Sequence, residues 1–141
     1  RTAGNRLVIL NTNFIIALRE GNQEAKEFAA EWEAKNLPLR VPTVVLQELY
    51  VGVGAGSKPN KNADEYEALL ANKPVVPLDE NIARRAGVIE GEHIASGEKP
   101  ELGLADSVVA ATGFVYNETV VTDDRSHFGT IDGLDFEPVP T

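Results

Sequence analysis

Short apolar runs alternate along the chain with longer segments in which apolar positions recur every three or four residues. The runs predict strands at residues 7–10, 37–41, 75–76, 119–121 and 136–139. The recurrence of apolar residues every three or four positions predicts helices at residues 14–20, 23–35, 44–53, 63–71, 79–90 and 104–116. We expect Thr43 and Asp79 to cap two of these helices, and residues 54–60 and 122–133 to form loops.

The order of these elements indicates the fold class. Strands that alternate with helices, usually two helices per crossover, favour an α/β fold of three layers. In that fold a mostly parallel sheet of short strands carries helices on both faces, and ligands bind at the carboxyl ends of the strands. We expect residues 1–141 to form a single domain, with residues 1–6 either a remnant added for expression or disordered.

Composition excludes several classes of function. The chain has no cysteine, which excludes disulfides, zinc–thiolate sites and cysteine nucleophiles. It has no apolar run near 18 residues and no visible signal peptide, so we expect a cytoplasmic protein that does not contact a membrane. Neither Ser107 nor Ser126 has the paired His and Asp of an acyl-transfer site. The glycines at residues 52–56 do not complete a phosphate-binding loop.

The net charge of −9 is unfavourable for a nucleic-acid binder, because Lys and Arg supply most phosphate affinity. Two explanations stay open. The excess acid covers a generally acidic surface, or part of it is concentrated at one cation site.

Four polar side chains fall where predicted strands end or where helices begin. They are Asn11, Glu48, Asp106 and Asp124. Each alone is also explained as a helix cap, a turn residue or a solvated surface residue. Together they predict one site at the carboxyl edge of the sheet, where clustered carboxylates would bind Mg²⁺ or Mn²⁺. We expect His93 to be a surface residue, and we expect no catalytic role for His127.

Four motifs, in order, carry a resemblance to a known family. Residues 8–13 are similar to an apolar strand ending in Asp-Thr-Asn/Ser, and residues 47–49 contribute Gln-Glu-Leu in the second helical region. Residues 104–111 are similar to an Asp-x-x-Ile-Ala-Ala helix, and residues 121–128 to a Thr-x-Asn/Asp-x-x-x-Phe loop. In this arrangement the chain resembles the PIN-domain nucleases, specifically the VapC-type toxins of toxin–antitoxin pairs.

The resemblance implies a Mg²⁺- or Mn²⁺-dependent endoribonuclease that cleaves structured RNA. It implies that Asn11, Glu48 and Asp106 line the metal site and that Asp124 completes it. Thr12, Thr122 and Asp123 would support these side chains. VapC-type proteins commonly form homodimers and are silenced by a VapB-type antitoxin, so the resemblance implies both partners.

The basic residues available for RNA are few. Arg125 is nearest to the predicted site and is our candidate for substrate binding. The other candidates are Arg19, Lys58, Lys61, Arg84 and Arg85.

Asn11 departs from the family pattern, which has Asp at this position. An amide carries no charge, so we expect this copy to be inactive or weakened. Asn11 is explained either as an engineered Asp→Asn replacement or as the native residue of a degenerate member. Two other functions stay open, a PIN nuclease of RNA processing and a catalytically silent module that binds RNA or protein.

Overall fold

The computed structural model describes residues 7–139, and the segment predicted to be a remnant or disordered lies outside this range. The elements are β1 (Val8–Leu10), α1 (Thr12–Arg19), α2 (Gln23–Ala34), β2 (Leu39–Pro42), α3 (Thr43–Ala55), α4 (Pro59–Leu70), β3 (Val75–Val76), α5 (Glu80–Ser96), α6 (Leu104–Tyr116), β4 (Thr119–Val121), α7 (Arg125–Phe128) and β5 (Phe136–Glu137).

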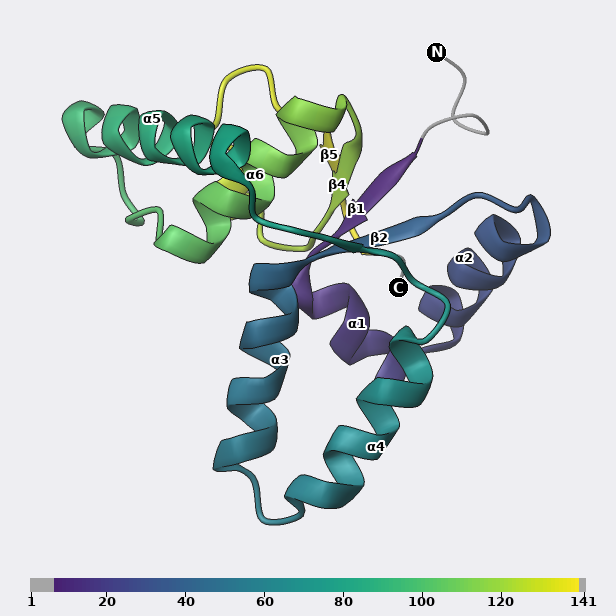
Figure 1. Ribbon diagram of the computed structural model, residues 1–141. Helices are drawn as coiled ribbons and strands as arrows, with labels where there is room; N and C mark the ends of the chain where they lie inside the picture. The colour runs from purple at the N-terminus through teal and green to yellow at the C-terminus, as the bar shows by residue number, and fades with distance from the viewer. Residues whose placement is uncertain (1–6, 140–141) are drawn as a thin grey trace.

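The strands form one five-stranded sheet in the order β3-β2-β1-β4-β5, and every neighbouring pair is parallel. Two helices connect β1 to β2, β2 to β3, and β3 to β4. Figure 1 shows α5 and α6 on one side of the sheet and α1 and α2 on the other. The predicted three-layer α/β fold with paired crossover helices is therefore confirmed.

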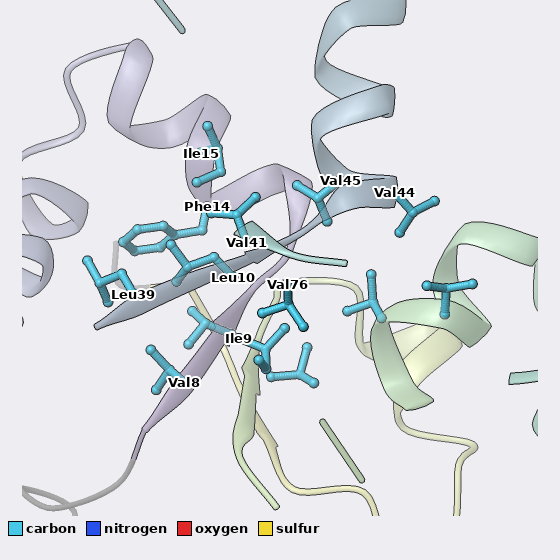
Figure 2. Packing of buried hydrophobic residues seen from close by; sticks show 14 of the residues in the cluster. Val8, Ile9, Leu10, Phe14, Ile15, Leu39, Val41, Val44, Val45 and Val76 are labelled. Carbon is cyan, nitrogen blue, oxygen red and sulfur yellow. The ribbon is translucent and has the colours of Figure 1, made fainter. Parts of the chain in front are cut away.

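β1 lies at the centre of the sheet, and its three side chains are fully buried. Figure 2 shows the apolar side chains of β1, β2 and β3 gathered with those of α1 and α3. A parallel strand covered on both faces needs apolar residues at every position rather than at alternate ones. That requirement explains why β1 is a continuous apolar run in the sequence.

α6 lies directly on the sheet, and its residues from Ser107 to Gly113 are buried. Gly113 allows the close approach to β4. A Cβ at this position would lie 2.9 Å from Val120 Cγ2 and 3.2 Å from the carbonyl oxygen of Glu118. The bounds predicted for this helix, residues 104–116, are confirmed.

Two predicted loops are wrong in part. Residues 54–60 contain the end of α3 and the start of α4, which has Pro59 at its first position, where proline fits a helix. Residues 122–133 contain α7, whose four residues are too few to show a period.

One of the two predicted caps is confirmed. Asp79 accepts a hydrogen bond from the backbone N–H of Ile82 at the start of α5. Thr43 is not a cap, because Pro42 occupies that position. The Thr43 hydroxyl instead accepts from the backbone N–H of Leu78 at 3.1 Å. Within residues 7–139, no helix is both long enough and apolar enough to cross a membrane.

Candidate metal centre

The carboxyl ends of β1 and β4 place Asn11 and Thr122 side by side. The two strands pair in register from Val8 with Thr119 to Leu10 with Val121. The backbone N–H of Asn11 then donates to the carbonyl of Val121 at 3.1 Å. The side-chain amide of Asn11 donates to Thr122 Oγ1 at 2.9 Å, and only 6% of Asn11 is exposed. The central pair of strands thus fixes this amide at the edge of the sheet.

The Thr122 hydroxyl connects two segments of the chain. Its oxygen accepts from Asn11 Nδ2, from the backbone N–H of Asp124 at 3.0 Å and from Asn13 Nδ2 at 3.5 Å. Thr122 is almost fully buried. A buried hydroxyl with these partners holds the start of α1 and the turn before α7 in one arrangement.

Asp124 caps the short helix α7. Its Oδ1 accepts from the backbone N–H of His127 at 3.1 Å and from the hydroxyl of Ser126 at 3.0 Å. Its Oδ2 lies 2.6 Å from His127 Nδ1. Burial opposes ionisation of the Asp124 carboxyl, but the hydrogen bonds from His127 and Ser126 outweigh it and lower its pKa. The group is therefore held as an oriented carboxylate.

Asp106 lies in the first turn of α6, after Gly103 at the cap position. Burial raises the pKa of the Asp106 carboxyl, and the negative charges of Asp124 and Glu48 raise it further. The nearby His127 acts in the opposite direction. The distance from His127 Nδ1 to Asp106 Oδ2 is 3.9 Å. A carboxylate that burial and like charges destabilise is one that a cation would stabilise.

Glu48 is exposed on α3, at the edge of this group. Its Oε1 accepts from the hydroxyl of Thr12 at 2.6 Å, which ties α3 to the start of α1. After burial and the charge of Asp124, the negative charge of Glu48 is a further cause that raises the pKa of the Asp106 carboxyl. Glu48 thus contributes to the negative potential of the site.

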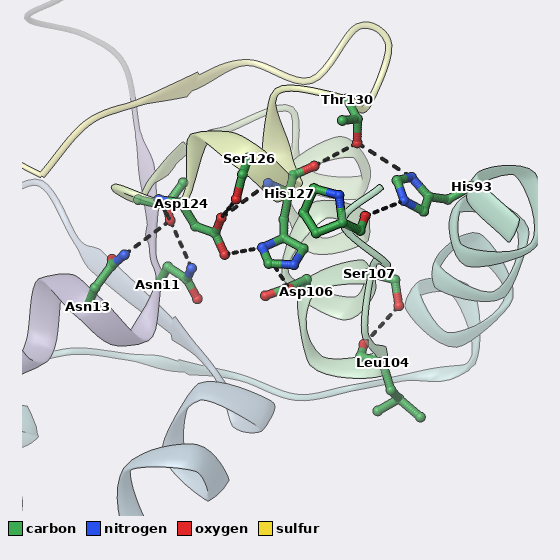
Figure 3. A network of polar contacts seen from close by, with 12 residues as sticks. Asn11, Asn13, His93, Leu104, Asp106, Ser107, Asp124, Ser126, His127 and Thr130 are labelled. Atoms are coloured by element: carbon green, nitrogen blue, oxygen red, sulfur yellow. Dashed lines mark hydrogen bonds and ion pairs between the residues drawn. The ribbon is translucent and has the colours of Figure 1, made fainter. Parts of the chain in front are cut away.

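Among residues 7–139, one group of three acidic or imidazole side chains has the spacing of a metal site. One ligand atom each from Asp106, Asp124 and His127 lie within 4.8 Å of one another. Figure 3 shows these three side chains together, beside the amide of Asn11. The two carboxylates suit Mg²⁺ or Mn²⁺, whereas an imidazole is a more typical ligand of transition-metal ions.

Sequence reasoning gave His127 no part in the site. It follows Asp124 by three residues, and residues at that spacing meet on one face of a helical turn. The three-residue spacing did not indicate a contact between Asp124 and His127, because no helix was predicted at these residues. The prediction for His93 is wrong, since only 8% of this residue is exposed.

The remaining candidates lie around the centre in different ways. Asp123 Oδ1 accepts from the backbone N–H of Val139 at 2.7 Å, so it anchors the C-terminal segment. Arg125 is exposed at the start of α7. Arg19 is engaged elsewhere, with Glu65, Asn62 and the ring of Tyr66.

The sequence and the fold both match known proteins. The PIN domain family model matches residues 8–134. The fold is similar to that in DNA-bound VapBC2 from Rickettsia felis, with 23% identity, 94% of this chain and 98% of that chain covered, and a TM-score of 0.83. DNA-bound VapBC from Salmonella typhimurium gives 22% identity, 95% and 98% coverage, and a TM-score of 0.83. Mycobacterium tuberculosis VapC20, a sarcin–ricin loop cleaving toxin, gives 16% identity, 86% and 93% coverage, and a TM-score of 0.64. No curated protein shows significant sequence similarity to the chain.

Proposed function

The chain belongs to the PIN domain family, and we propose from this premise that it is a VapC-type, metal-dependent endoribonuclease that Asn11 weakens. The observation that carries the proposal is the meeting of Asp106, Asp124 and His127 at the carboxyl edge of a parallel sheet. Parallel α/β sheets bind their ligands at that edge. Cleavage of structured RNA is supported by the fold similarity to VapC20, a sarcin–ricin loop cleaving toxin.

The residues present fit a divalent cation. Asp106 and Asp124 are the proposed ligands, with Glu48 close enough to raise the pKa of Asp106. Asn11 offers its amide oxygen, since its nitrogen is bonded to Thr122. When bound, Mg²⁺ or Mn²⁺ would neutralise charge that develops on the phosphate and make water a better nucleophile.

The chain's own residues provide orientation. Thr122 holds Asn11 and the backbone of Asp124, and Thr12 holds Glu48, so each oxygen is aimed before any ligand arrives. His127 Nδ1 is bonded to Asp124 Oδ2, which fixes the imidazole at the same place. Such fixed polar groups need little rearrangement as charge develops in a reaction. Arg125 is the proposed contact for an RNA phosphate.

The expected partners follow the same proposal. Several of the similar structures are VapBC toxin–antitoxin complexes. We propose that a VapB-type antitoxin binds this chain and that the chain forms a homodimer. A cytoplasmic location stays a prediction from the sequence. The role in RNA processing is the alternative, and an antitoxin reading frame beside the gene would decide between them.

The test is RNA cleavage by the Asn11→Asp variant. With Mn²⁺ we expect cleavage of a structured RNA, and we expect EDTA to stop it. The matched control is the Asn11→Asp/Asp106→Asn double variant, which should not cleave. If Asn11→Asp is folded by circular dichroism and cleaves no RNA in a total RNA pool, the nuclease proposal is wrong. RNA binding that neither EDTA nor Asn11→Asp changes would instead support a silent binding module.

A further inference from the structure

A cavity lies beside the acidic centre, between α5, α6 and residues 130–132. Its volume is about 450 Å³, which is within the range of small-molecule sites. Thr130 lines this cavity and also connects it to the centre, because its hydroxyl donates to the backbone carbonyl of His127 at 2.8 Å. Figure 3 shows the connection, which runs from Asp124 through His127 and Thr130 to His93. None of the residues assigned to the metal centre lines the cavity.

One wall of the cavity is formed by Arg85 and Phe114. The guanidinium carbon of Arg85 lies 4.6 Å from the centroid of the Phe114 ring. Arg85 is exposed and makes no ion pair within residues 7–139, whereas its neighbour Arg84 pairs with Glu80. A guanidinium that lies over an aromatic ring can also stack on a planar ligand. Bases of single-stranded RNA stack on arginine planes of this kind.

His93 presents a buried acceptor on the cavity wall. Its Nε2 lies 2.9 Å from the carbonyl oxygen of Pro100, which can only accept, so Nε2 carries a hydrogen and donates it. The imidazole tautomer with its hydrogen on Nε2 has a lone pair on Nδ1. Thr130 Oγ1 lies 3.5 Å from Nδ1, at the limit of a hydrogen bond, and the Thr130 hydrogen is already donated to the carbonyl of His127. This long contact leaves the Nδ1 lone pair able to accept from a ligand that brings an N–H group.

Carboxylates supply further acceptors around the cavity, from Glu92, Glu98 and Asp132. These charges disfavour a phosphate and favour an uncharged, planar group that is rich in hydrogen-bond donors. Among the RNA bases, guanine has two adjacent donor positions, the ring N1–H and the exocyclic amine. Uracil has a single ring N–H between two carbonyl groups.

We propose that this cavity binds one guanine base of the RNA, turned out of the strand beside the scissile phosphate. The base stacks on Arg85, and its N–H edge faces His93 Nδ1 and the neighbouring carboxylates. Since α7 connects the cavity with the acidic centre, the bound base sets which phosphate lies at Asp106 and Asp124. This inference rests on the ribonuclease function proposed above and adds a specificity site to it.

The test is binding of nucleosides, which lack the phosphate that the carboxylates would repel. Guanosine, inosine and uridine are titrated into the isotope-labelled chain in EDTA, and backbone amide shifts are followed by NMR. We expect guanosine to shift the signals of Arg85, Phe114 and Thr130 and to saturate. Inosine lacks only the exocyclic amine, so it should bind about tenfold more weakly, as for loss of one hydrogen bond to a charged group.

Arg85→Ala should weaken guanosine binding about tenfold, because it removes the stacking surface. Arg84→Ala is the matched control and should leave the affinity unchanged, since Arg84 does not line this cavity. The NMR spectrum of each variant shows whether it is folded. Equal affinities for guanosine and uridine, or equal effects of the two arginine variants, would overturn the proposal.

The outcome separates this proposal from the proposed nuclease function. If guanosine binds as expected and Asn11→Asp cleaves no RNA, the base-binding site stands and the nuclease function is wrong. If Asn11→Asp cleaves RNA and guanosine does not bind, the nuclease function stands and the cavity is not a guanine site.

Discussion

The side-chain amide of Asn11 donates a hydrogen bond to the hydroxyl of Thr122, at 2.9 Å and across 111 positions of the chain. This bond uses the amide nitrogen, so the amide oxygen is the atom left for a ligand. An Asp side chain here would reverse the bond, since a carboxylate accepts the hydrogen of Thr122. Its second oxygen would then bring a charge to the acidic centre. Replacement of the Asn11 amide nitrogen by an oxygen would thus change the charge of the site with little change in its shape.

Thr122→Val should destabilise the protein, because it leaves the buried amide of Asn11 and the backbone N–H of Asp124 without their acceptor. We expect a loss of about 2 kcal/mol in the free energy of unfolding, measured by urea denaturation. Thr112→Val is the matched control. The Thr112 hydroxyl donates to a carbonyl within its own helix. Thr112→Val should therefore lower the free energy of unfolding by less than Thr122→Val does. Equal losses in the two variants would contradict the role given to Thr122.

Asp106→Asn should stabilise the metal-free protein at neutral pH. Burial raises the pKa of Asp106 above the ordinary value of 3.8, so ionisation of this group costs stability in the folded state. The stability of the native protein relative to Asp106→Asn is therefore highest below pH 3.8 and falls as pH rises through the raised pKa. Urea denaturation in EDTA at pH 7 and at pH 3.5 measures the difference.

The gain from Asp106→Asn should disappear at the lower pH, where the carboxyl is protonated in both states. It should also disappear when Mn²⁺ is added at pH 7, because the ion favours the charged form. If Asp106→Asn instead destabilises the protein in EDTA at pH 7, the ionised Asp106 carboxyl does not cost stability in the folded state.

The arrangement of sheet and helices was predictable because both depend on local patterns. The β1 run is apolar at every position, and α6 carries apolar residues on nearly all sides, so burial was visible in each. The end of α3 was predicted two residues early, since Gly54 and Gly56 suggested a flexible segment. The helix continues to Ala55 because Val53 packs into the core, which outweighs the low helix propensity of glycine.

Gly113→Ala should destabilise the protein, because the added Cβ would lie 2.9 Å from Val120 Cγ2 at the contact of α6 with β4. Overpacking of this kind costs about 1–3 kcal/mol. Gly87→Ala on α5 is the matched control, since a Cβ there meets nothing within 4 Å. That variant should be neutral or up to about 1 kcal/mol more stable. Thermal unfolding of both variants measures the difference, and a stabilising Gly113→Ala would show that α6 lies further from the sheet.

The site was predictable only in outline. Asn11 and Asp124 follow strands, so their meeting at the edge of the sheet could be expected from the parallel topology. The contact of His127 with Asp124 could not, because it depends on a helix of four residues. The bond between Thr12 and Glu48 joins segments 36 residues apart and depends on the angle between α1 and α3, which no sequence pattern gives.

The most direct test of the account is the affinity for Mn²⁺ of this chain and of Asn11→Asp, measured by calorimetry in the same buffer. The account predicts that Asn11→Asp binds Mn²⁺ at least about tenfold more tightly, because a charged oxygen joins Asp106 and Asp124. Asn13→Asp adds the same charge two positions further on and should give a smaller gain. Equal Mn²⁺ affinities for this chain and Asn11→Asp would contradict the assignment of Asn11 to a metal centre.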